Sequence, residues 1–289
     1  MNKVKMFTLT PAGLPERLMQ IPSPPKLLYC AGTLSMEELL SKPIVAVVGS
    51  RKVDRYGSHV TTMLARGLAE RGIIIVSGLA YGVDALAHTA CLEAGQPSIG
   101  VIASGIANPT PSGTIAIARR IVSNGVLVSE HDGNYEPFKH DFLIRNRLIA
   151  GIADAVVVPQ AAARSGSLNT AQHALEQGRT VMAVPGDITN PLSEGPNNLI
   201  KMGATPVTSV DDVLAVLNIS NDPMQKNYDL LATNEAERLI IGLLQQGVVD
   251  GDALQQLSKL SAAECGSHLT MLELRGIIAP LGANRWTLK

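Results

Sequence analysis

The residues that decide the fold are 44–82, which read IVAVVGSRKVDRYGSHVTTMLARGLAERGIIIVSGLAYG. This stretch opens with the apolar run Ile44–Val48, continues with the helical periodicity of Gly57–Arg71, and ends with a second apolar run, Ile73–Val76. Runs of Val and Ile with little polar alternation are typical of parallel strands that are buried on both faces. The stretch therefore predicts a strand–helix–strand unit with a right-handed crossover.

The same alternation continues on both sides of this unit. Further strands are expected at Leu27–Cys30, Ser98–Ala103, Val126–Ser129, Ala155–Val158 and Thr180–Val184. Helices are expected at Val83–Ala94, Gly113–Asn124, Phe142–Ala150 and Leu168–Gln177. This repetition predicts an α/β fold with an extended Rossmann-like, doubly wound and mostly parallel sheet.

A change of pattern near residue 218 predicts a second domain. The segment Asn218–Asn227 is rich in Asn, Asp and Ser, as domain linkers are. Beyond it, two short strands within Gly276–Leu288 follow three helical stretches, at about Asn234–Gln246, Gly251–Leu257 and Ser261–Leu274. We therefore expect an N-terminal extension that partly joins the core sheet, a Rossmann-like domain, a linker and a small C-terminal winged-helix-like domain, at 1–42, 43–218, 219–227 and 228–289.

The composition of the 289-residue chain excludes several classes of protein. The net charge of −1 excludes a polycation that coats nucleic acid, but not a local basic groove. With 3% aromatic residues, a platform of many stacked rings is not expected. Met1–Thr10 lacks the apolar run of a signal peptide, and Ile44–Val48 is far shorter than the ~20 residues of a membrane span. We therefore expect a cytoplasmic protein without membrane contact.

Side chains for catalysis or metal binding are sparse. The cysteines form no CxxC pair and are interpreted as buried small hydrophobes: Cys30, Cys91 and Cys265. Asp84 and His88 lie four residues apart on one helix face, where they could form an acid–base pair or bind a metal. Since no third ligand or nucleophile elbow accompanies them, we favour a hydrogen bond between the two that supports the loop Ser77–Gly82. We expect no catalytic residue, no metal and no cofactor.

Three loops rich in Gly and Ser follow predicted strands or open predicted helices. They are Gly49–Arg51, Ser77–Gly82 and Ser165–Thr170. Backbone N–H groups at a helix start, together with the positive end of the helix dipole, suit phosphate. Each loop alone is equally compatible with a turn that requires glycine. At one edge of a parallel sheet, however, the three together predict a groove for phosphate groups.

The sequence also narrows the phosphate ligand. Neither the dinucleotide fingerprint G-x-G-x-x-G nor the P-loop G-x-x-x-x-G-K-[ST] is present. Arg51 instead stands where a pyrophosphate-binding turn would have glycine, and its guanidinium can hold phosphate oxygens with two bonds. These loops suit a nucleic-acid strand, but a nucleotide-binding sensor or a nucleotide-processing enzyme that uses the same groove is the alternative.

A basic segment favours the nucleic acid. Lys139, Arg145 and Arg147 are expected to cluster around Phe142, and cations around a ring are typical of single-strand binding. Two residues apart on a helix, Arg145 and Arg147 point in different directions, so at most one of them faces the ligand. A solvated helix start is the other interpretation of this segment.

In these segments the chain resembles the DNA-processing protein A (Smf) family, in an ordered series that covers about Leu27–Leu217. The matching segments are Gly49-Ser50-Arg51 with Tyr56-Gly57; Ser77–Asp84 with Ala87-His88; Ser129-Glu130; Phe142 with Arg145–Gly151; Ser165–Leu168 with Thr170-Ala171; Glu176–Arg179; Ala183–Gly186; and Asn198–Ile200 with Gly203-Ala204. The chain departs from the family pattern at Leu143, where proline is usual, at Pro159-Gln160, and in Ser104–Gly113, which lacks the usual Tyr-Pro.

The resemblance implies a dimeric, non-enzymatic protein that binds and protects incoming single-stranded DNA during natural transformation and recombination, and helps to load the RecA recombinase on it. It points to Ser50, Arg51, Lys139, Phe142 and Asn146 as DNA-binding residues. The cation cluster adds Arg145, and the helix-start argument adds Ser167 and Thr170. Residues expected to support the loops are Gly49, Gly78, Gly82, Asp84, His88 and Gly166. The C-terminal domain has no basic excess, so protein contacts, or no ligand binding at all, are the better expectation for it.

Overall fold

The computed structural model describes residues 4–219 and 232–288. The chain divides into two compact units, Met1–Asn221 and Asp222–Lys289. Apart from Ile219, the linker predicted at 219–227 lies outside the described residues. No helix among the described residues is long and apolar enough to cross a membrane.

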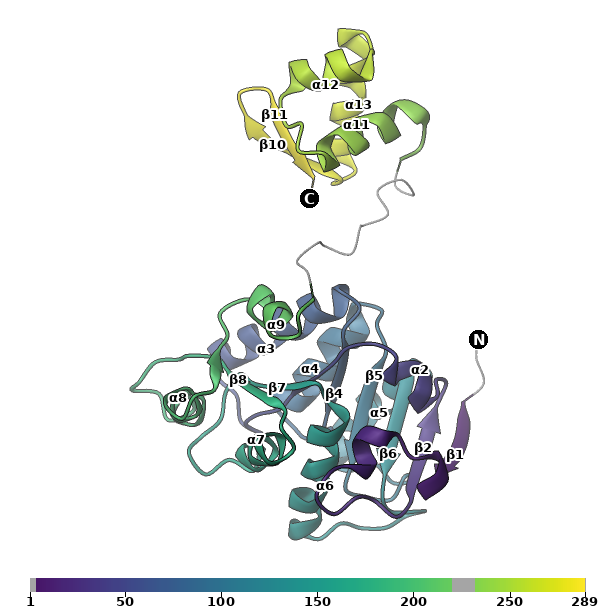
Figure 1. The fold of residues 1–289 in the computed structure, drawn as a ribbon, viewed down its shortest axis with the longest axis vertical. Helices are drawn as coiled ribbons and strands as arrows, with labels where there is room; N and C mark the ends of the chain where they lie inside the picture. Colours follow the sequence, from purple (N-terminus) through teal and green to yellow (C-terminus); the bar gives the residue numbers. More distant parts are fainter. Residues whose placement is uncertain (1–3, 220–231, 289) are drawn as a thin grey trace. The chain divides into compact units, whose positions relative to one another are not determined.

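The first unit is built on a nine-stranded sheet in the order β1-β2-β6-β5-β4-β3-β7-β8-β9 (Figure 1). Its strands are β1 (Lys5–Leu9), β2 (Leu28–Gly32), β3 (Ile44–Val47), β4 (Ile74–Ser77), β5 (Ser98–Ile102), β6 (Gly125–Ser129), β7 (Ala155–Val158), β8 (Thr180–Ala183) and β9 (Thr205–Pro206). The strands from β3 to β9 pair in parallel, whereas β1 and β2 join the sheet antiparallel. The predicted α/β, mostly parallel sheet is confirmed.

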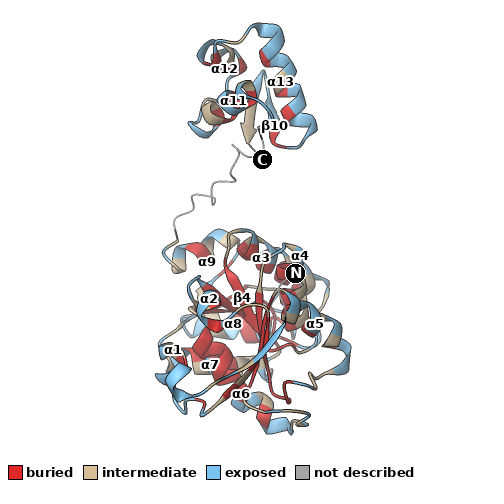
Figure 2. Ribbon diagram, turned by 90° about the vertical axis from the view of Figure 1, so that its right-hand side faces the viewer, coloured by how far each residue is buried: buried red, intermediate tan, exposed pale blue. Residues whose placement is uncertain are grey.

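Helices cover both faces of this sheet. They are α1 (Glu16–Met19), α2 (Met36–Leu40), α3 (Arg55–Glu70), α4 (Val83–Glu93), α5 (Ile115–Ser123), α6 (Lys139–Ile152), α7 (Ser167–Glu176), α8 (Glu194–Lys201) and α9 (Val210–Val216), with short 3₁₀ turns at Pro11–Gly13 and Ser112–Thr114. Ala46 of β3 packs with α6 and α7 in one core, whereas its neighbours Val45 and Val47 pack with α3, α4 and α9 in another. Alternate residues of one strand thus enter opposite cores, and Figure 2 shows the buried strands between the helix layers.

The structure contains elements that the sequence did not predict, namely α1, α2, α8, α9 and β9. Two further differences have a physical cause. The exposed edge strand β1 was not predicted, because its alternating pattern carries little apolar signal. Helix α6 begins at Lys139, three residues before the predicted start at Phe142. The reason is Asp141, whose carboxylate accepts the backbone N–H of Phe138 at 2.8 Å and thereby stabilises an earlier helix start.

The second unit contains the predicted three helices and hairpin. Its elements are α11 (Glu235–Gln245), α12 (Gly251–Ser258), α13 (Ala262–Leu274), β10 (Ile278–Gly282) and β11 (Arg285–Leu288). Ser261 begins α13 with a capping box, in which its side chain accepts the N–H of Glu264 and the Glu264 side chain accepts the N–H of Ser261. Apolar side chains such as Ile240, Leu254 and Leu272 form a core of this unit's own.

Candidate functional site

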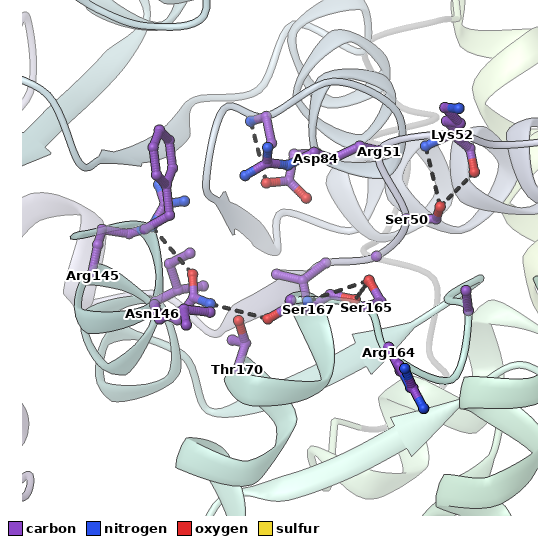
Figure 3. A pocket seen from close by; sticks show the side chains of 18 of the residues that line it. Ser50, Arg51, Lys52, Asp84, Arg145, Asn146, Arg164, Ser165, Ser167 and Thr170 are labelled. Carbon is purple, nitrogen blue, oxygen red and sulfur yellow. Dashed lines mark hydrogen bonds between the residues drawn. The ribbon is translucent and has the colours of Figure 1, made fainter. Parts of the chain in front are cut away.

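A cavity of about 410 Å³ lies at the carboxyl ends of β3 and β7. From β3 the chain proceeds to β4 on one side, and β7 lies on the other side of β3, so this is the point where the strand order reverses. Doubly wound sheets bind their ligands at such a switch point. Figure 3 shows that side chains converge there from the loop after β3, from α6 and from the start of α7.

The loop after β3 is held in place by its own backbone contacts. Ser50 donates its N–H to the carbonyl oxygen of Gln160 at 2.7 Å, and its hydroxyl accepts the N–H of Lys52 at 3.1 Å. A side chain on Gly49 would lie 2.5 Å from the Gln160 carbonyl oxygen, so the loop requires glycine there. Ser50 is buried, whereas Arg51 and Lys52 are exposed. The loop therefore presents two cations on a fixed backbone.

Gln160 connects this loop to the start of α3. It stands where the Smf-like pattern differs, and it is almost completely buried. Its Nε2 donates to the carboxylate of Asp54 at 2.8 Å, while Asp54 accepts the N–H of Gly57 at 2.8 Å as the N-cap of α3. The hydrogen bond from Gly57 is the largest factor that lowers the pKa of Asp54. The departure at residue 160 thus has a structural role that the sequence did not indicate.

Arg51 lies over the ring of Phe142, with 5.3 Å between the guanidinium carbon and the ring centroid. This cation–π contact joins the β3 loop to α6 and fixes the direction of a long, flexible side chain. Among residues 4–219 and 232–288, Arg51, Lys52 and Arg164 form no ion pair with an acidic side chain. All three line the cavity, so their charges are available to a ligand.

Arg145 also lines the cavity, but its guanidinium is engaged by the protein. The side chain is buried, and Nη1 donates to the carbonyl oxygen of Gly78 at 2.7 Å and to that of Val101. Burial lowers the pKa of Arg145 to about 10, and the nearby Asp84 opposes that shift. Arg145 therefore holds the loop after β4 against α6.

Asp84 stabilises the same loop from the other side. Its Oδ2 accepts the N–H groups of Gly78 at 3.1 Å and of Ala80 at 3.3 Å. Burial is the main cause of a raised pKa for Asp84, and Arg145 acts in the opposite direction. A side chain on Gly78 would collide with both Asp84 and Arg145. This loop thus depends on a buried acid, a buried base and a glycine between them.

The predicted hydrogen bond between Asp84 and His88 is wrong. His88 Nδ1 instead lies 2.8 Å from the hydroxyl of Ser98, which itself donates to the carbonyl oxygen of Ile75. Complete burial lowers the pKa of His88 to about 3, so the ring is neutral. His88 anchors α4 to β5 and does not reach the loop carboxylate, because Asp84 is directed toward the backbone of the Ser77–Gly82 loop.

The predicted cation cluster around Phe142 is also wrong. Arg147 forms an ion pair with Glu130 through two contacts of 2.6 and 2.7 Å, and it donates to the carbonyl oxygen of Ser23 at 2.8 Å. Arg145 is directed toward β4 and β5, as described above. The helical spacing of Arg145 and Arg147 separates them, and the cation that reaches the Phe142 ring comes from the distant residue Arg51.

The start of α7 completes the cavity. Asn146 of α6 donates to the carbonyl oxygen of Gly166 and to the side-chain oxygen of Asn169, both at 3.2 Å. The hydroxyls of Ser165 and Ser167 lie 2.8 Å apart, and Thr170 is buried at the cavity wall. The amino end of α7, with its positive partial charge, therefore faces the same space as the free cations.

Most of the predicted residues meet at this cavity. It brings together Gly49, Ser50, Arg51, Asp84, Phe142, Arg145, Asn146, Gly166, Ser167 and Thr170. Four predicted residues are not among the described residues that line the cavity: Lys139, Gly78, Gly82 and His88. Ser165 of the third predicted loop also lines the cavity, as does Lys52, whereas the sequence analysis did not assign Leu143 or Arg164 to the site. The position of Arg164 beside the Ser-Gly-Ser loop was the available signal for that residue.

Gly82 supports the site from outside the lining. Its φ is +74°, and a side chain there would lie 2.2 Å from the carbonyl oxygen of Ser50. Glycine therefore allows the loops after β3 and β4 to touch. Within the described residues, no group of three His, Cys, Asp or Glu side chains is placed to hold a metal ion.

Comparison with known proteins identifies related sequences. The family model "DNA recombination-mediator protein A" matches residues 5–218, and the model "DprA winged helix domain" matches residues 227–284, which confirms the winged-helix prediction. The DNA processing protein DprA of Streptococcus pneumoniae is 40% identical over 214 residues, covering 74% of this chain and 74% of its own length. That of Bacillus subtilis is 39% identical over 204 residues, covering 70% and 68%.

Solved structures agree with these matches. The X-ray structure of DprA from Streptococcus pneumoniae superposes with a TM-score of 0.69 at 39% identity, over 73% of this chain and 74% of that chain. A structure of DNA processing protein A from Helicobacter pylori, described for its single-stranded DNA binding mode, gives a TM-score of 0.67 at 31% identity, over 74% and 96%.

Proposed function

The chain belongs to the DNA recombination-mediator protein A family, and we propose that the cavity between β3 and β7 binds the backbone of single-stranded DNA. The observation that carries this proposal is that Arg51, Lys52 and Arg164 line one cavity and, within the part of the chain that the structure describes, form no ion pair with an acidic side chain. Phosphate contacts supply most of the affinity of such proteins. The Helicobacter pylori relative, which has a unique single-stranded DNA binding mode, lends support.

We assign two kinds of role to the predicted residues. The residues that we propose contact the strand are Arg51, Phe142, Ser167 and Thr170, the last two through their hydroxyls. The exposed Lys139 contacts the strand outside the cavity. Ser50, Arg145 and Asn146, whose polar groups bind the protein itself, act as positioning residues. The remaining loop-supporting residues are Gly49, Gly78, Gly82, Asp84, His88 and Gly166.

Family membership supports a more specific proposal. We infer that the protein protects incoming strands during natural transformation and recombination, and that it helps to load the RecA recombinase on them as a homodimer. Binding without catalysis is consistent with the neutral, buried His88 and with Asp84, which is engaged by backbone N–H groups. A reaction is not needed for this role, since the ligand leaves the site unchanged.

Fluorescence anisotropy with a labelled oligonucleotide tests the proposal. Arg51→Ala removes a charge-assisted phosphate contact, so we expect affinity to fall about 10- to 100-fold for every sequence. Lys42→Ala is the matched control, because it removes an equal charge from an exposed residue two positions before β3, at the other end of that strand. Measurements at two salt concentrations should also give a weaker salt dependence for Arg51→Ala than for wild type.

Two results would contradict this proposal. Equal losses in Arg51→Ala and Lys42→Ala would mean that general charge, and not the cavity, binds the strand. A large thermal stabilisation by mononucleotides with none by oligonucleotides would instead favour the nucleotide-binding alternative.

A further inference from the structure

An exposed pair of rings lies at the start of α6, outside the described lining of the cavity. Phe138 is 65% exposed, and the side chain of His140 is 68% exposed. Their rings are stacked, with centroids 5.8 Å apart and 7° between the planes. We call these two residues the Phe138–His140 pair. Single exposed apolar side chains are common, but a parallel pair of exposed rings presents a flat surface on which another ring can stack.

Contacts with Asp141 hold the Phe138–His140 pair in position. The buried carboxylate of Asp141 accepts the N–H of Phe138 at 2.8 Å and the hydroxyl of Tyr135 at 2.9 Å through Oδ2. Its Oδ1 lies 3.2 Å from Nε2 of His140. Tyr135 in turn stacks on His131, with ring centroids 3.9 Å apart. Rings that are already ordered lose little conformational entropy when a ligand binds, so this arrangement favours binding.

The position of the pair relates it to the cavity. Phe138 is the N-cap residue of α6, and the first turn of that helix leads directly from it to Phe142, which lines the cavity and carries Arg51 on its ring. Lys139 lies between Phe138 and His140 in the chain, is exposed, and among the described residues forms no ion pair with an acid. A nucleic-acid strand that is bound in the cavity and continues beyond it would meet a ring surface for a base and a cation for a phosphate.

We propose that the Phe138–His140 pair is a second base-stacking subsite, which holds a nucleobase of the strand just outside the cavity while Lys139 contacts the phosphate between the two positions. The inference rests on the proposed single-strand binding and extends it. It also explains why Lys139 lies outside the cavity lining, because its partner phosphate is then outside as well.

Competition binding with oligothymidylates of increasing length tests this subsite in the full-length protein. Phe138→Leu keeps an apolar side chain but removes the ring, and Phe138→Trp restores a ring at the same position. For long oligonucleotides we expect Phe138→Leu to bind about 5- to 100-fold more weakly than wild type, with Phe138→Trp close to wild type. For the shortest oligonucleotides that fill only the cavity, the three proteins should bind alike.

The outcomes separate this inference from the proposed function. If wild type binds the strand and Phe138→Leu binds equally at every length, the subsite is refuted while strand binding stands. If wild type binds no oligonucleotide, both proposals fail. If Phe138→Leu leaves DNA affinity unchanged but alters the molar mass measured by light scattering, the pair serves a contact between copies of the chain, and the subsite is likewise refuted. An equal loss in Phe138→Leu and Phe138→Trp would also overturn the stacking argument, since only one of them lacks a ring.

Discussion

The cavity of the first unit and the helix α13 of the second unit use charge in opposite ways. The cavity gathers Arg51, Lys52 and Arg164 at one sheet edge, without acidic partners among the described residues. Helix α13, in the position where winged helices usually read DNA, contains no Lys or Arg. Its exposed positions include Ala263, Thr270 and Leu274, which cannot neutralise phosphates. A net charge of −1 therefore conceals one region in which cations gather and one helix that contains no Lys or Arg.

The same contrast applies to two pairs of charged residues, each of which includes a buried acid. In the first unit, Asp84 and Arg145 hold a loop whose residues reach the cavity. In the second unit, Glu237 and Arg275 form a pair at 2.8 Å that joins α11 to the end of α13. One pair holds a loop at the cavity, whereas the other joins two helices. The following predictions test this difference, from the largest expected effect to the smallest.

Arg145→Ala should affect the first unit alone. The change leaves the carbonyl oxygens of Gly78 and Val101 without a donor and removes the charge that offsets the burial of Asp84, so the free energy of unfolding should fall by about 3–5 kcal/mol. Circular dichroism reports mainly the larger unit, and Trp286, the chain's single tryptophan, reports the second unit by fluorescence. We expect the first signal to shift to lower denaturant and the second to stay. A shift in both would show that the two units unfold together.

Arg51→Lys should separate geometry from charge in the cavity. Lysine keeps the positive charge but lacks the planar fork that binds two phosphate oxygens and stacks on Phe142. We expect single-strand affinity to fall about fivefold, with the slope of affinity against salt unchanged. Wild-type affinity in Arg51→Lys would mean that the ring contact with Phe142 is not needed.

The smallest effect is expected in the second unit. Arg238 and Arg285 are exposed cations there, and the double variant Arg238→Ala/Arg285→Ala removes two charges where Arg51→Ala removes one. If α13 and its hairpin do not contact the strand, anisotropy should detect a change in affinity of less than about twofold. A loss as large as that of Arg51→Ala would place the second unit on the DNA.

Much of this contrast could be predicted from the sequence, since parallel strands, glycine-rich loops and helical periodicity are local signals. The predictions that failed concern residues whose contact partners are distant in the chain. Nothing near Arg51 indicates that its guanidinium lies over Phe142, and nothing near His88 indicates that Ser98 provides its hydrogen bond. Likewise, Arg147 is directed away from the cavity by its ion pair with Glu130, which lies in the loop after β6. The helical spacing predicted that the side chains of Arg145 and Arg147 point in different directions, but only the folded structure shows the partner of each.

The order of the strands has a consequence for protein synthesis. Strand β3 pairs with β4, its successor in the chain, but its other neighbour, β7, emerges from the ribosome only after β5 and β6. The cavity needs the loop after β3 and the start of α7 together. A nascent chain that ends before Thr170 therefore exposes the cations of its early loop without the opposite wall. The cavity is therefore completed late, when most of the sheet has already been translated.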